Sequence, residues 1–130
     1  MATVDGNWHH LCLSWRNTDG AYKLYINGSL HYQGVRDIGH VIPKGAIVLG
    51  QEADSYIGSF SSSQSFQGNL TGFNLWNRVL SAQEVSDLAK CKASAGQGNI
   101  VTWTDLKDKG EGATEKIIID FCCHGKNIFF

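Results

Sequence analysis

Hydrophobic and polar residues alternate in two early segments of the chain, which is the pattern of half-buried β-strands. Residues 8–15 read WHHLCLSW and residues 21–26 read AYKLYI. In the first segment both faces carry large side chains, which favours an inner strand of a layered sandwich over a strand with one solvent-facing side. In the second, Tyr22, Leu24 and Ile26 share one face, opposite Lys23 and Tyr25.

Turn signals join these segments into a meander. Asp19-Gly20 follows the first segment, and Asn27-Gly28 follows the second. Both dipeptides favour tight hairpins, because their residues tolerate positive φ. The chain would then return antiparallel over residues 29–33, so we expect a three-stranded meander in the first third.

Further strands are predicted over residues 46–49, 68–76 and 99–103, from short apolar or alternating runs. The Ser- and Gly-rich segment 50–67 breaks the pattern and predicts a long surface loop.

One helix is well marked. Ser81 followed three residues later by Glu84 forms a capping box, and Leu80 with Val85 forms a hydrophobic staple. The helix is expected to end near Cys91.

Composition narrows the classes of protein. Eleven Lys and Arg against twelve Asp and Glu give a net charge of −1, which argues against a nucleic-acid partner and against electrostatic anchoring to a membrane. No apolar run is long enough to span a membrane. Asn27 and Asn69 begin N-glycosylation sequons. The first residues hold no signal peptide, so an extracellular type of sequence without an export signal suggests a fragment, an isolated domain or an alternative transcript product.

The loop around residue 52 holds the most informative polar residues. Glu52, Asp54, the Ala53 carbonyl and Gln64 all offer oxygen atoms, and Ca²⁺ takes about six to eight such ligands. On spacing alone a solvated acidic turn is the better interpretation, because these donors fall short of a full shell.

Other chemistry-bearing residues favour structural roles. His9 and His10 are neighbours in a strand and point to opposite faces, so they cannot share one metal ion. Ser14 and Cys12 lack a nucleophile elbow and a positioned base, so no hydrolase is indicated. The four Trp residues are interpreted as core anchors, with a sugar-stacking platform as the alternative. The sequence has four cysteines, which leave three disulfide pairings open. These cysteines are Cys12, Cys91, Cys122 and Cys123.

Several motifs together resemble the C-terminal half of a pentraxin domain: DGNWHHLCLSW, YINGSL, IPKGAIVLGQEAD, QSFQGNLTGFNLWNRVLSAQEV and GNIVTW. The resemblance covers residues 5–103. It implies an all-β, two-sheet antiparallel jelly-roll sandwich of the concanavalin and laminin-G kind, truncated at its N-terminus, with one short α-helix. We expect a partial domain over residues 1–106 and a tail outside the family over residues 107–130.

The resemblance also implies a calcium site. Glu52 and Asp54 match the family's carboxylate ligands, Ala53 its backbone carbonyl and Gln64 its later amide. Ser61 stands where better calcium binders have Glu, and the Asp-Asn pair of the domain's other half is absent. Calcium binding is therefore expected to be weak or lost.

Two cysteines carry further implications of the resemblance. Cys12 matches a cysteine that pairs with one in the absent half, so here it would be a free thiol. Cys91 has counterparts in longer and receptor-borne pentraxin modules. The parent would then be a mosaic protein, such as an adhesion-class G-protein-coupled receptor or a matrix protein.

We therefore expect a non-enzymatic extracellular or cell-surface recognition module. Its partner would be a protein, or a glycan or phosphate-bearing ligand, and the family leaves room for an oligomer. The alternative is a laminin-G or lectin-like module that binds glycans without calcium. An accessory domain of a carbohydrate-active enzyme is disfavoured, because the only close acidic pair lies in a loop.

Overall fold

The computed structural model describes residues 5–51 and 61–110. The chain divides into two compact units, which we describe separately. One unit comprises residues 1–39 and 70–130, and the other comprises residues 40–69.

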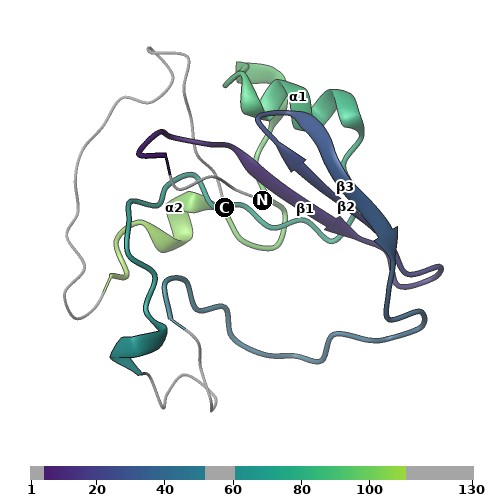
Figure 1. Cartoon of the computed structure of the whole chain (residues 1–130), viewed down its shortest axis with the longest axis horizontal. Coiled ribbons are helices and arrows are strands. Elements are labelled where there is room, and N and C mark those ends of the chain that lie inside the picture. Colours follow the sequence, from purple (N-terminus) through teal and green to yellow (C-terminus); the bar gives the residue numbers. More distant parts are fainter. Residues whose placement is uncertain (1–4, 52–60, 111–130) are drawn as a thin grey trace. The chain divides into compact units, whose positions relative to one another are not determined.

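The first unit contains a three-stranded antiparallel sheet in the order β1-β2-β3 (Figure 1). The strands are β1 (Leu11–Trp15), β2 (Ala21–Ile26) and β3 (Ser29–Val35). Leu13 pairs with Leu24, and Leu24 pairs with Tyr32, so these apolar side chains share a face. The predicted meander is confirmed.

The two hairpins turn where the sequence predicts. Asn27 and Gly28 have φ values of 52° and 81°, which is the positive-φ pair that a type I′ turn requires. Gly20, before β2, has φ of 69°. A Cβ atom at Gly20 would come within 2.6 Å of the Arg36 carbonyl oxygen, so only glycine fits at this position.

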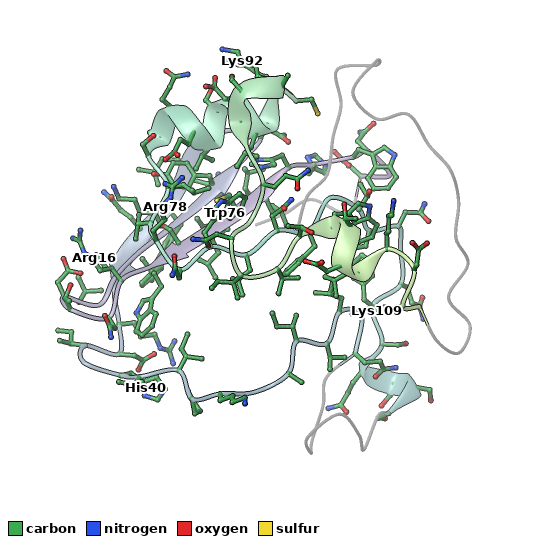
Figure 2. The ribbon with its side chains drawn as sticks, turned by 180° about the vertical axis from the view of Figure 1, so that it is seen from behind. Arg16, His40, Trp76, Arg78, Lys92 and Lys109 are labelled. Carbon is green, nitrogen blue, oxygen red and sulfur yellow. The ribbon has the colours of Figure 1, made fainter. Side chains whose placement is uncertain are left out.

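Helix α1 spans Ala82–Ala89 and begins with the predicted capping box. The Glu84 amide donates to Ser81 Oγ at 3.1 Å, and the Ser81 amide donates to Glu84 Oε2 at 2.8 Å. Arg78 donates to both Glu84 oxygens, at 3.0 and 2.7 Å (Figure 2). This pairing fixes the carboxylate that caps the helix.

One face of the sheet meets α1 in a small core. Tyr25 of β2, Leu80 and Val85 are buried and form one cluster, with Cys12, Trp76 and Leu88 packed around it. The buried pair Leu80 and Val85 confirms the predicted hydrophobic staple. Side chains of β1 and β2 that point to this face therefore hold the helix against the sheet.

The strands predicted over residues 68–76 and 99–103 are wrong. In their place the structure has a single bridge between Leu75 and Val101. Backbone bonds join the two segments at this bridge, where the Leu75 amide donates to the Val101 carbonyl at 2.9 Å and the Ile100 amide donates to the Leu75 carbonyl at 3.0 Å. Asparagine side chains extend the contact: Asn74 Oδ1 accepts from the Gly98 amide, and Asn99 Oδ1 accepts from the Asn77 amide. These local side-chain bonds compete with regular pairing.

Residues 103–106 form a helix rather than the end of a strand. Helix α2 spans Trp103–Leu106 and starts with a capping box, in which Asp105 Oδ2 accepts from the Thr102 amide at 2.8 Å. The Thr102-to-Asp105 spacing is itself a helix-start signal, but the apolar residues just before it favoured the prediction of a strand. A short 3₁₀ turn, η2 (Ala93–Ala95), lies between α1 and α2.

The unit of residues 40–69 has little regular structure in its described part. It contains a 3₁₀ turn, η1 (Ser62–Gln64), and an antiparallel bridge between Gln51 and Ser65. The strand predicted over residues 46–49 does not form, so that prediction is also wrong. Across the described residues, no helix is long and apolar enough to cross a membrane.

Candidate functional site

The candidate calcium loop lies in the unit of residues 40–69. Glu52, Ala53 and Asp54 lie outside the described residues, whereas both flanks of the loop are described. The bridge between Gln51 and Ser65 joins these flanks, and the Phe66 amide donates to the Gly50 carbonyl at 2.8 Å. The loop is therefore closed at its base by backbone contacts.

Gln64 stands directly beside this base. It is the last residue of η1, and its backbone amide donates to the Ser61 carbonyl at 3.0 Å. Ser65, the next residue, pairs with Gln51, and Gln51 immediately precedes Glu52. Glu52 and Gln64 are far apart in the sequence, but each is the chain neighbour of one member of the Gln51–Ser65 bridge.

Gln51 adds an oxygen that the sequence analysis did not consider. Its side-chain Oε1 is buried and has no hydrogen-bond partner among the residues that the structure describes. Buried acceptors without partners are uncommon in folded proteins and call for a donor or a cation nearby. Gln51 lies within the LGQEAD motif, but its sequence position alone does not predict that its side chain is buried.

Outside this loop, the described residues contain no group of three His, Cys, Asp or Glu that could hold a metal ion. His9 and His10 diverge, as predicted. His9 Nε2 lies 2.9 Å from Asp5 Oδ1, whereas His10 is 2% exposed. Burial lowers the pKa of His10 to about 4, and the hydrogen bond from His9 lowers the pKa of Asp5.

The predicted glycosylation residues lie in different units. Asn27 is in the β2–β3 turn, and its Oδ1 accepts from the His10 amide at 2.9 Å. Asn69 is an exposed residue at the end of the unit of residues 40–69.

The two predicted disulfide cysteines are not paired with each other. Cys12 is a half-buried thiol in β1 with no disulfide partner among the described residues, and burial raises its pKa. Cys91 follows α1 with a φ of 52°. Cys122 and Cys123 lie outside the described residues.

All four tryptophans are partly buried. Trp76 packs against the cluster under α1 (Figure 2), and the Trp15 indole donates to the Arg36 carbonyl at 3.0 Å. Their half-buried state fits anchoring positions at the edge of a core better than a fully packed interior.

In the described part of the chain, the sheet face opposite α1 is apolar and only partly covered. Strand pairing places one set of side chains on it, and none of them is buried. Leu13 is 70% exposed and Tyr32 is 59% exposed. Exposed apolar patches on proteins commonly mark interaction surfaces. Its residues are Leu11, Leu13, Trp15, Tyr22, Leu24, Ile26 and Tyr32.

Comparison with known proteins gives a consistent result. Residues 1–116 match the Pentaxin family. Neuronal pentraxin-1 of Rattus norvegicus is 36% identical over 120 residues, which are 91% of this chain and 28% of that protein. The "Sushi, von Willebrand factor type A, EGF and pentraxin domain-containing protein 1" of the same species is 40% identical over 119 residues, 89% of this chain and 3% of that protein. The chain therefore spans less than a third of the relatives it matches.

A solved structure resembles the fold as well. The native heptameric SAP-like pentraxin from Limulus polyphemus superposes with a TM-score of 0.65 at 31% identity. The match covers 77% of this chain and 47% of the Limulus chain. About half of that solved chain thus has no counterpart among the matched residues.

Proposed function

Because this chain belongs to the pentraxin family, we propose that it is part of a non-enzymatic extracellular recognition domain. The family match over residues 1–116 is the observation that carries the proposal. The relatives include neuronal pentraxins and a protein whose name joins a pentraxin domain to other modules. A mosaic parent, such as a cell-surface receptor or a matrix protein, is consistent with that second relative.

The complete domain is proposed to be a two-sheet jelly-roll sandwich. Two observations support this. The first is that one sheet face packs on α1, while the other is apolar and exposes Leu13 and Tyr32. The second is that the matched Limulus chain is about twice as long as the matched region. A second sheet that covered Leu13 and Tyr32 would bury the apolar area that the described sheet exposes.

Calcium is proposed to bind weakly in the loop after Gln51. Glu52 and Asp54 would supply carboxylates, Ala53 its carbonyl and Gln64 its side-chain amide oxygen. The bridge between Gln51 and Ser65 supports a site shared by Glu52 and Gln64, because each of these residues is the chain neighbour of a bridged residue. Ser61 stands where the better calcium binders of the family have Glu, and its Oγ lies 2.8 Å from Ser63 Oγ. A hydroxyl brings no negative charge, so the affinity is expected to be low.

The ligand is proposed to be a phosphate-bearing or glycan group held through the calcium face, or a protein partner. An oligomer is also proposed, since the Limulus relative is described as heptameric. The near-neutral charge of the chain gives no support to a nucleic-acid partner.

The test is ligand binding with and without calcium. The full chain is applied to an immobilised phosphomonoester and to a glycan array, in millimolar Ca²⁺ and in EDTA. Binding that falls in EDTA supports the proposal. Glycan binding that is unchanged by EDTA contradicts the calcium part and favours the lectin-like alternative.

A matched pair of variants locates the site. The double variant Glu52→Gln, Asp54→Asn keeps the side-chain shapes and removes the charges, so the calcium effect should disappear. Asp37→Asn removes an exposed carboxylate on the other unit, and the calcium effect should persist. A calcium effect that survives in the double variant contradicts the assigned loop.

A further inference from the structure

We propose that the two sequons of this chain have different fates: Asn69 accepts an N-linked glycan, whereas Asn27 stays unmodified as a structural residue of the sheet. The inference rests on the proposed extracellular location, because the glycan donor is available only to exported chains. Sequence alone does not separate the two sites, since both have the Asn-X-Ser/Thr pattern. Exposure does not separate them either, because both asparagines are exposed.

The Asn27 side chain extends the pairing of β1 with β2. Its backbone amide donates to the His10 carbonyl at 2.8 Å, and its Oδ1 accepts from the His10 amide at 2.9 Å. This reciprocal pair continues the ladder one residue beyond Leu11 and Ile26. The carboxamide therefore satisfies a backbone donor next to a buried residue, as buried strand ends require.

The nitrogen that a glycan would use is also engaged. Asn27 Nδ2 lies 3.3 Å from His9 Nδ1, and His9 Nε2 lies 2.9 Å from Asp5 Oδ1. In glycosylation a bond forms between Nδ2 and C1 of the first sugar, while the bond from C1 to a lipid-linked diphosphate breaks. Nδ2 loses a proton, and the lipid diphosphate leaves. A sugar on Nδ2 would then occupy space beside His9.

The turn around Asn27 is crowded from a second direction. A Cβ atom at Gly28 would lie 3.0 Å from Ala89 Cβ and 3.2 Å from Ser86 Cα, so this turn packs closely on α1. An oligosaccharide at the preceding residue would have to avoid both α1 and the His9 ring. A glycan on Asn27 and the folded hairpin are therefore mutually exclusive.

Asn69 has none of these constraints. Within the described part of the chain its side chain makes no hydrogen bond, and it lies in a segment without regular structure. The preceding Gly68 has φ of 155°, and the Phe66 ring lies close to it, since a Cβ atom at Gly68 would be 2.9 Å from that ring. A glycan at Asn69 would break no side-chain hydrogen bond in the described part of the chain.

The test uses the full chain behind a secretory leader in cultured mammalian cells, with intact mass measured before and after removal of N-glycans. The expected result is a single glycan per chain. Thr71→Ala, which removes only the second sequon, should abolish it. Ser29→Ala, which removes only the first sequon and leaves Asn27 in place, should leave the mass shift unchanged.

Each other outcome contradicts the proposal. A glycan lost in Ser29→Ala, or two glycans on the secreted chain, would place a sugar on Asn27. A chain with no glycan at all would remove Asn69 as a site. Asn69→Gln replaces Thr71→Ala if the latter is not secreted, and the cell-associated fraction gives the same mass readout. Ligand binding is measured separately, so failure here leaves the calcium test of the proposed function unaffected.

Discussion

Folding alters the charge state of His10. Its pKa falls to about 4 from an ordinary value of 6.5, because burial disfavours the imidazolium. The unfolded chain therefore binds a proton between pH 6.5 and 4 that the folded chain does not. Stability should fall as the pH is lowered through this window, by up to roughly 3 kcal/mol for a full shift of this size.

This prediction is checked by urea unfolding of the chain from pH 7 to pH 4.5. His10→Phe, which cannot be protonated, should flatten the dependence. The capping carboxylate Glu84, whose pKa its partner Arg78 lowers from 4.5 to about 2, adds to the pH dependence only as the pH falls below about 4.5, at the lower end of the measured range. An equally steep loss of stability in His10→Phe would contradict the account.

Gly98 is a second residue whose identity the structure requires. A Cβ atom there would lie 2.2 Å from the Val101 carbonyl oxygen and 2.7 Å from the Leu75 carbonyl oxygen. Gly98→Ala should therefore destabilise the chain by about 2 kcal/mol, because backbone atoms cannot give way as a flexible side chain would. Gly45→Ala, whose new atom would meet nothing closer than 3.9 Å, is the matched control. Equal unfolding midpoints for both variants would contradict the prediction.

Among the elements, α1 depends most on local sequence. Ser81→Ala removes the side-chain acceptor for the Glu84 amide and should cost about 1 kcal/mol. Ser81→Asp keeps an acceptor at the cap and should cost much less. Urea unfolding followed by circular dichroism distinguishes them, and similar losses in both variants would show that the cap does not stabilise the helix.

The elements also show how far sequence predicts this fold. The hairpin turn at Asn27-Gly28 and the capping box at Ser81 are local signals, so both were predictable. The segments 68–76 and 99–103 alternate like strands, but a strand needs a partner. Here the two segments pair through one bridge between Leu75 and Val101, and the Asn74 and Asn99 side chains bond to the backbone beside it. In the candidate site, the spacing of Glu52, Asp54 and Gln64 was visible, whereas the burial of Gln51 Oε1 depends on tertiary contacts.

For the whole molecule, the central claim is that this chain is one part of a two-layer pentraxin sandwich. The three-stranded sheet packs on α1 through Tyr25 and leaves the face of Leu13 and Tyr32 open. Burying a leucine side chain is worth roughly 1.5–3 kcal/mol. Leu13 should therefore matter little in the isolated chain and much in the completed domain.

The most direct measurement mixes the full chain with the separately produced part of the Limulus polyphemus pentraxin that has no counterpart here, and follows association by analytical ultracentrifugation. The account predicts a one-to-one complex that Leu13→Asp weakens by about tenfold or more. Gln33→Asp, an exposed position on the opposite face of the sheet, should leave the complex intact. Absence of a complex, or a complex equally tight in Leu13→Asp, would contradict the claim.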